Sequence, residues 1–299
     1  MAEGCDDMRR SPNTTALDRL IPPGIGGSVL GAVLDAIVVL GAASMLVPML
    51  WMVSTSLKPP GGILSIPPQL LPRPIDWRNY VRVFEQEPFG VFLFNSVKIS
   101  SLATVGMLLS CALAGFTFAR LRFPGKGTLF SLLMATLMVP GAVTLVPRFI
   151  LMRTLGWLDT HYALIVPSWT GAAFGIFLLR QHYLAMPQDL LDAGRIDGAS
   201  YFSIFWQIFL PLSKPALATL GVLTFLGSWN DLMGPLIMLN STEKFTVTLG
   251  LTFFRGQMTD IAWGPLMAAT VMGILPTLTL FAGAQQYFVR GIVTTGLKG

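Results

Sequence analysis

The chain has 299 residues, of which 53% are hydrophobic and 12% are charged, about half the ~25% charged fraction of a typical soluble domain. This composition excludes an ordinary soluble protein. The net charge of +5 comes from cations scattered between apolar runs, which argues against nucleic-acid binding. Cys5 and Cys111 lie far apart, one in a polar tail and one in an apolar run, and suggest neither a disulfide framework nor a thiolate metal site.

Six apolar runs follow a polar, proline-containing N-terminal tail of residues 1–28, which we expect to be poorly ordered. The first run is too long and begins too late for the core of a signal peptide, so we interpret it as a retained helix. A transmembrane helix needs ~20 apolar residues, and each run satisfies this length. The predicted spans are residues 29–54, 92–119, 128–150, 163–183, 216–239 and 266–287. The sequence therefore predicts an all-α polytopic membrane protein with six core transmembrane helices.

The connections between these runs indicate an orientation. The loop after the second run, residues 120–127, is short and carries Arg120, Arg122 and Lys126. Short loops rich in Lys and Arg favour the cytoplasm, and an even number of spans then places both termini inside. By the same count, the polar tail of residues 290–299 emerges on the cytoplasmic side.

The long connection between the fourth and fifth runs predicts two short helices joined by a sharp turn, over residues 187–211. Pro187 suits the start of a helix whose positive end is favoured by two early aspartates. Asp197-Gly198 is a turn signal, and Ser200 can cap the second helix. Such an exposed corner, with apolar side chains beside charged ones, fits a groove on a partner protein. The alternative is a helical hairpin packed under its own bundle.

Polar residues near the end of the fifth run have two open interpretations. A carboxylate facing lipid costs ~2.5 to 3.5 kcal/mol on insertion scales, so Asp231 is expected to avoid lipid. In one interpretation these side chains face a translocation pathway. In the other, they bond to a neighbouring helix or cap a break before Gly234-Pro235. The candidate pathway residues are Ser228, Trp229, Asn230 and Asp231.

The sequence shows no motif typical of catalysis, nucleotide binding or metal binding. Gly125-Lys126-Gly127-Thr128 has the wrong order and spacing for a phosphate-binding loop. His161 and His182 sit at predicted span ends without a ligand partner at helical spacing, which favours interfacial histidines over a metal site. We therefore expect a non-enzymatic subunit that binds no cofactor itself.

A set of motifs resembles the inner-membrane permease subunits of binding-protein-dependent ABC importers, in the branch that serves maltose, other sugars and glycerol phosphate. The family signature, Glu-Ala-Ala, three residues, Gly and then Ile-x-Leu-Pro, stands here as Asp192-Ala193-Gly194, Gly198 and Ile208-Phe209-Leu210-Pro211. Asp192 replaces the usual Glu, and Gly194 replaces an Ala at a helix cost of roughly 1 kcal/mol. Further matches are Leu57-Lys58-Pro59, Asn79-Tyr80, Asn95-Ser96, residues 119–125, residues 225–231 and the ending from residue 289.

The resemblance implies that residues 29–289 form a permease domain and that the corner is a cytoplasmic coupling helix between spans 4 and 5, seated in an ATPase subunit. The implied coupling residues are Asp192, Ala193, Gly194, Arg195, Asp197, Gly198, Ala199 and Phe202. The implied partners are a second permease, an ATPase dimer that uses ATP and Mg, an extracytoplasmic solute-binding protein and membrane lipid. The implied location is the cytoplasmic membrane of a bacterium or archaeon.

By the same resemblance, the C-terminal tail should reach the ATPase dimer interface through Arg290, Gly291 and Lys298, whereas the plain alternative is a frayed terminus. Two other classes remain as rivals. A secondary transporter or channel would act without an ATPase, but the sequence lacks the two similar halves common in such transporters. A membrane enzyme is disfavoured because no catalytic set is present. The sequence does not select one sugar or related solute.

Overall fold

The computed structural model describes residues 26–63, 65, 67–255 and 262–296, and helices are the only regular secondary structure among them. The chain divides into two compact units, Met1–Met52 and Val53–Gly299. The described part of the first unit is most of helix α1 (Gly26–Ser56), in which Asp35 is the one charged residue. Pro48 lies inside α1 without ending it. The predicted first span is therefore one continuous helix, apolar on all sides as membrane spans are.

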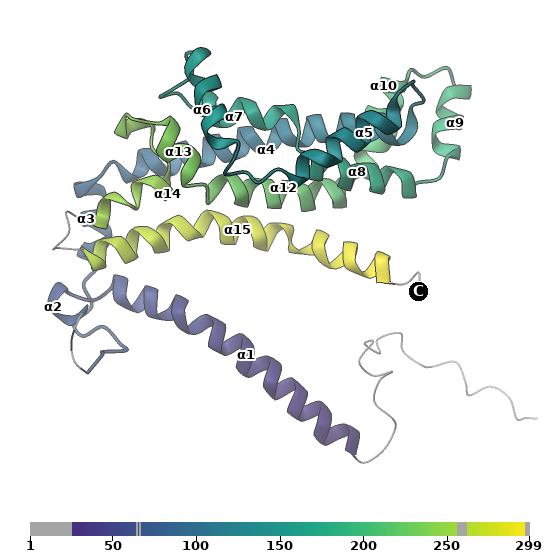
Figure 1. The fold of residues 1–299 in the computed structure, drawn as a ribbon. Coiled ribbons are helices and arrows are strands. Elements are labelled where there is room, and N and C mark those ends of the chain that lie inside the picture. Colours follow the sequence, from purple (N-terminus) through teal and green to yellow (C-terminus); the bar gives the residue numbers. More distant parts are fainter. Residues whose placement is uncertain (1–25, 64, 66, 256–261, 297–299) are drawn as a thin grey trace, which may run out of the picture. The chain divides into compact units, whose positions relative to one another are not determined.

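The second unit contains the remaining helices (Figure 1). These are α2 (Pro60–Ile63), α3 (Arg78–Gln86), α4 (Phe89–Arg120), α5 (Lys126–Ala135), α6 (Leu145–Thr154), α7 (Tyr162–Ile165), α8 (Ala173–Ala185), α9 (Asp189–Ile196), α10 (Tyr201–Ile204), α11 (Leu210–Leu212), α12 (Lys214–Trp229), α13 (Met233–Met238), α14 (Val247–Gly250) and α15 (Trp263–Gly296). Shorter 3₁₀ segments are η2 (Thr136–Met138), η3 (Val166–Thr170), η5 (Thr242–Lys244) and η6 (Phe253–Arg255), and η4 (Phe205–Phe209) is a π-helix.

Helix α4 is the centre of this unit, and it packs along α8 and α12 (Figure 1). Its N-terminal half joins one buried cluster, which includes Phe92 and Trp229. Its C-terminal half joins another, which includes Phe116 and Tyr183. Between the two, the indole of Trp169 lies so close to α4 that a Cβ at Gly106 would be 1.7 Å from it. The close approach requires glycine at this position.

Two asparagines from the motifs hold loops by their side-chain amides. Asn79 Nδ2 donates to the carbonyls of Ser56 and Lys58, at 2.9 and 2.8 Å. Asn95 Nδ2 donates to the carbonyls of Glu243 and Phe245, at 2.9 and 3.0 Å. Because carbonyl groups at loop ends otherwise remain unpaired, these amides fix the loops at the end of the bundle where α3 and α14 lie.

Four helices in the described part of the chain are long and apolar enough to cross a membrane. They are Gly31–Ser56, Phe89–Arg120, Tyr162–Ala185 and Trp263–Gln285. A fifth candidate counts Tyr201–Leu212 and Lys214–Trp229 as one span, although the two are bent by 78°. The protein is therefore an all-helical, multi-pass membrane protein.

The predicted third span, residues 128–150, is wrong as a single helix. The helix stops at Met138, residues 139–144 form turns, and α6 begins only at Leu145. Pro140 explains the break, because proline lacks an amide hydrogen and disfavours helical backbone in the residue before it. The turn is closed by hydrogen bonds from Val143 N to Pro140 O and from Thr144 N to Gly141 O, at 3.0 and 3.2 Å.

Other predicted spans are also interrupted or extended. The fourth is divided at Gly171, whose φ of 81° separates η3 from α8. The fifth is two helices, since α12 ends at Trp229 and α13 begins at Met233. The sixth does not end at residue 287: α15 continues to Gly296 past Pro276. The backbone at Arg290 and Gly291 is therefore helical, and Lys298 lies outside the described residues.

Candidate functional site

The first feature of interest is the corner, defined as residues 187–211, which lies at the end of the bundle formed by α4, α8 and α12 (Figure 1). Its first helix, α9, ends in two hydrogen bonds: Gly198 N donates to Arg195 O at 3.1 Å, and Ala199 N donates to Gly194 O at 3.0 Å. This pair of bonds is a Schellman motif, which needs a left-handed residue after the helix. Gly198 provides it with a φ of 76°.

The return arm of the corner begins at a side-chain cap. Ser200 Oγ accepts a hydrogen bond from Ser203 N at 3.2 Å, as the sequence predicted. After α10, the chain forms the π-helix η4, a rare form that is frequent at functional sites. The side chains of Ile204, Phe205 and Phe209 are buried there against the bundle. The predicted helix, turn and helix are therefore present.

The corner has a buried face and an exposed face. Leu191 and Gly194 are buried under the bundle, so the alternative of a packed hairpin holds for one side. On the other side, Ile196 is 86% exposed and Phe202 is 63% exposed. Phe202 stacks on Trp206, with ring centroids 6.2 Å apart. Among the predicted coupling residues, Asp192, Ala193, Arg195, Asp197, Gly198 and Phe202 are exposed, Ala199 is half-buried and Gly194 is buried. Apolar side chains exposed beside charges are typical of a surface that binds another protein.

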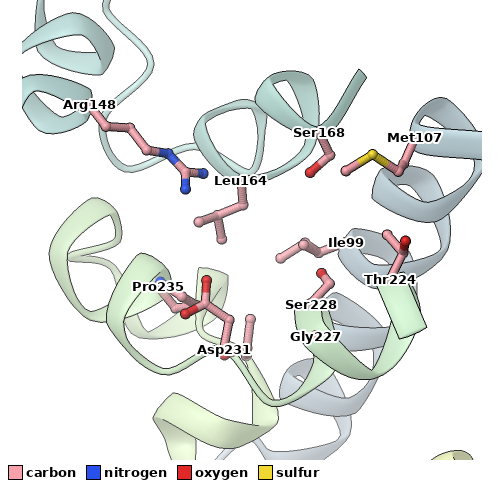
Figure 2. A pocket seen from close by; sticks show the side chains of 11 residues that line it. Ile99, Met107, Arg148, Leu164, Ser168, Thr224, Gly227, Ser228, Asp231 and Pro235 are labelled. Atoms are coloured by element: carbon pink, nitrogen blue, oxygen red, sulfur yellow. The ribbon is translucent and has the colours of Figure 1, made fainter. Parts of the chain in front are cut away.

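The second feature is a cavity of about 290 Å³ between α4, α6, α12 and their neighbours (Figure 2). Figure 2 shows the guanidinium of Arg148 and the carboxylate of Asp231 directed into this space. Hydroxyl groups and apolar side chains complete the wall. The lining residues are Ile99, Met107, Arg148, Leu164, Ser168, Thr224, Gly227, Ser228, Asp231, Pro235 and Thr246. A wall with one cation, one anion and several hydroxyls suits a polar, uncharged or weakly charged solute.

The predicted pathway residues fall into two groups. Ser228 and Asp231 line the cavity. Trp229 is only 3% exposed, and its indole N–H donates to Gly273 O at 3.2 Å. Asn230 Nδ2 donates to Leu226 O of its own helix at 2.9 Å. Asp231 Oδ1 accepts from Gly234 N at 3.1 Å, so the side chain caps α13 and borders the cavity at once.

A charged cluster fixes the loop after α6 to the loop after α13. The carboxylate of Asp159 accepts from Lys244 Nζ at 2.8 Å, from Ser241 Oγ at 2.5 Å and from the amides of Asn240 and Ser241, both at 2.9 Å. The hydrogen bond from Lys244, and to a smaller extent the one from Ser241, holds the pKa of Asp159 well below its usual value. Nearby, His161 Nε2 donates to Lys244 O at 2.9 Å, and burial lowers the pKa of His161.

Comparison with known proteins decides the family. Residues 106–294, more than half of the chain, match the family described as binding-protein-dependent transport system inner membrane component. The chain belongs to this family. As an inner membrane component of such a transport system, it is a transport subunit, in line with the resemblance read from the motifs.

Individual relatives of this inner membrane component are named for the uptake of sugars and glycerol phosphate. The arabinooligosaccharides transport system permease protein AraQ of Halalkalibacterium halodurans is 36% identical over 74% of this chain and 79% of the relative. The sn-glycerol-3-phosphate transport system permease protein UgpE of Yersinia enterocolitica is 32% identical over 77% and 84%. A crystal structure of a bacterial ABC transporter involved in the import of the acidic polysaccharide alginate has the same fold, with a TM-score of 0.79 at 23% identity, over 93% of this chain and 100% of that chain.

Two residues at these features were not identified as site residues from the sequence. Arg148 lies in the predicted third span, where a charge among apolar residues was a usable signal. Arg120 was noted only as a loop cation that indicates orientation. Its hydrogen bonds to residues far along the chain could not be read from local pattern.

Proposed function

We propose that this inner membrane component is the permease subunit of an ATP-driven importer of a sugar or sugar-like solute, such as a polyol or glycerol phosphate. It works as a heterodimer with a second permease, and an ATPase dimer and an extracytoplasmic solute-binding protein complete the complex. ATP and magnesium act in the ATPase subunits, so this chain needs no cofactor. The observation that carries the proposal is the corner, an exposed apolar surface on the end of the same bundle that encloses the polar cavity.

Coupling to the ATPase takes place at the exposed face of the corner. Ile196 and Phe202 would leave water for a groove on the ATPase, and burying such side chains stabilises an interface by about 1.5 to 3 kcal/mol each. The charged residues Asp192, Arg195 and Asp197 surround them and set the orientation of docking. Gly194 lies on the buried face of α9 and supports the corner from that side, because the absence of a side chain lets α9 pack closely on Ile204.

The membrane arrangement that we propose keeps six spans. The third is α5, η2 and α6 in sequence, and the fifth is α12 followed by α13. Breaks of this kind are tolerated in membranes when the irregular backbone lines a cavity, and Arg148 of α6 and Asp231 before α13 both border the cavity. Both termini and the corner lie in the cytoplasm, on the argument from the basic loop of residues 120–127.

The solute path runs through the cavity in alternating access. Hydroxyls of Ser168, Thr224 and Ser228 offer donors and acceptors at separate places on the wall, which suits a polyhydroxylated solute. The sugar class rests on the solutes named for the relatives. The C-terminal segment contacts the ATPase dimer through Arg290 and Gly291, which lie on α15, and through Lys298.

The test uses single cysteines in the reconstituted complex, after replacement of Cys5 and Cys111. A cysteine at Ile196, on the exposed face, should react with a water-soluble thiol reagent in the permease pair and become protected when the ATPase subunits are added. The matched control is a cysteine at Leu191, which is 5% exposed and should react slowly in both conditions. Uptake into proteoliposomes should require ATP and the ATPase. Uptake that continues without the ATPase would instead indicate a secondary transporter or channel.

A further inference from the structure

Arg120 is the last residue of α4, and its guanidinium bonds to three residues that follow it by more than sixty positions. Nη2 donates to Tyr183 O at 2.6 Å and to Met186 O at 2.5 Å. Nη1 donates to the side chain of Gln188, at 2.6 Å from Oε1. Short hydrogen bonds from a charged donor are about twice as strong as neutral ones, so the end of α4 is firmly tied to this segment.

The acceptors belong to two different helices. Tyr183 is in the last turn of α8 and Met186 is its C-cap. Carbonyls at the end of a helix lack the usual partner four residues later, and here the Tyr183 carbonyl also accepts a hydrogen bond from Met186 N at 3.2 Å. A cation there is also favoured by the negative end of the helix dipole. Gln188 is the N-cap of α9, the first helix of the corner. Arg120 therefore satisfies the end of α8 and holds the start of α9 with the same planar group.

The contacts of Arg120 extend into both arms of the corner. On the entry arm, Gln188 Nε2 donates onward to Asp192 Oδ1 at 3.4 Å, which connects Arg120 to the first residue of the coupling motif. On the return arm, the guanidinium lies 5.2 Å from the ring centroid of Phe209, in the π-helix. Phe209 is fully buried and packs on Phe116 of α4, with centroids 5.0 Å apart.

Two neighbouring cations show what is particular about Arg120. Lys126 Nζ donates to Leu121 O at 2.9 Å, and Arg180 Nε donates to Phe118 O at 3.2 Å. Arg180 also lies over the ring of Phe130, 4.2 Å from its centroid. These contacts of Lys126 and Arg180 hold the end of α4 to segments outside the corner, whereas those of Arg120 join that end to the corner.

We propose that Arg120 is a positioning residue for energy coupling, the link through which displacement of the corner is transmitted to α4. This rests on the proposed function, in which the ATPase moves the corner. A guanidinium suits the role, because its rigid fork bonds several oxygens in one plane and keeps them at fixed separation as they move. Without it, α9 could shift relative to α4, and ATP hydrolysis would proceed with little transport.

The experiment measures solute transported per ATP hydrolysed by purified, fully assembled complex in proteoliposomes. Arg120→Gln removes the charge-assisted hydrogen bonds and should lower this ratio by about tenfold. Arg120→Lys should recover part of it. Arg180→Gln is the matched control, since this arginine bonds to α4 at Phe118 and lies over Phe130, both outside the corner. The ratio for the Arg180→Gln variant should stay normal. Gln188→Leu removes the bond from Arg120 to α9 together with the bond from Gln188 to Asp192, and it should lower the ratio without loss of assembly. Gln188→Glu keeps an acceptor for Arg120 and loses the donor to Asp192, so the ratio for this variant should stay normal if the bond to Arg120 carries the effect.

The outcomes separate the inference from the proposed function. A purely structural role would reduce the amount of assembled complex and leave the ratio of solute to ATP unchanged in each variant. Normal ratios in both Arg120→Gln and Gln188→Leu, with uptake still dependent on the ATPase, would overturn the inference alone. Uptake by the unaltered complex that persists without ATPase subunits would overturn the proposed function, and the inference with it.

Discussion

The turn at Gly198 offers a prediction whose size follows from the structure. Its φ of 76° lies in the left-handed region, and a Cβ built at this position would meet nothing within 4 Å. A replacement therefore suffers no clash inside the chain, and the cost comes from backbone conformation alone. For residues other than glycine, the left-handed conformation costs roughly 1 to 2 kcal/mol. Because 1.4 kcal/mol is tenfold in an equilibrium constant, Gly198→Ala should lower the equilibrium constant for the native turn roughly 5- to 30-fold.

The side chains that tolerate this conformation differently give a graded series. Asn visits the left-handed region more readily than Ala, and β-branched Val visits it least. We therefore expect activity to fall in the order Gly, Asn, Ala, Val at position 198. Gly127→Ala in α5 is the control: it too has open space at Cβ, its φ is not positive, and alanine favours a helix by about 1 kcal/mol, so activity should persist.

The assay is solute uptake and binding-protein-stimulated ATP hydrolysis by the complete complex in proteoliposomes, with the amount of assembled permease measured in each variant. Loss of coupling or of ATPase binding in the predicted order supports the role of the corner. Normal uptake together with normal stimulation in Gly198→Val would refute the reasoning, because the most strained turn would then carry the full function.

Four further predictions test other parts of the protein. Gly194→Ala should destabilise the corner despite its gain in helix propensity, because the new Cβ would lie 2.9 Å from Ile204 Cγ1. A double-mutant cycle with Ile204→Ala, measured by thermal unfolding, should show a favourable coupling free energy of about 1 kcal/mol, and additive effects would contradict the prediction. Cysteines at Ser228 and Asp231, which line the cavity, should react with a small water-soluble thiol reagent, and the rate should change when nucleotide is added. A cysteine at the buried Trp229 should not react, and equal reactivity at all three positions would contradict the assignment. Because burial lowers the pKa of His161, the unfolded chain binds more protons than the folded chain at acidic pH, so the free energy of unfolding should fall as the pH drops below about 6.5. His161→Gln should reduce this pH dependence, and an unchanged melting curve of the unaltered protein between pH 7 and 5 would contradict the prediction. Deleting residues 294–299 should lower binding-protein stimulation of the ATPase while membrane insertion stays normal, and full activity of the shortened chain would show that the tail is dispensable.

Local pattern predicted those features whose cause is local. The Gly198 turn and the Ser200 cap were evident because both depend on residues within three or four positions of one another. The long helices were evident because their apolar runs exceed the width of a bilayer. The capping role of Asp231 was one of two open interpretations, and the structure supports it together with a place at the cavity.

The remaining features depend on contacts or conformations that hydropathy does not register. The break at Pro140 lies inside an apolar run, so a measure of hydrophobicity alone continues through it, although proline itself was a warning. The sequence does not distinguish Gly171, which has a positive φ, from an ordinary helical glycine. The need for glycine at position 194 became visible only when Ile204, ten residues later, was seen against it.

The unbroken length of α4 has a mechanical consequence. At 32 residues it is ~48 Å long, well beyond the ~30 Å of a hydrocarbon core, and it is one continuous helix without proline. A stiff rod of that length amplifies rotation: turning it by about 10° around one end displaces the other end by roughly 8 Å. A small angular change imposed where Arg120 stands would thus become a displacement as wide as a sugar ring at the opposite end, with no hinge needed between them.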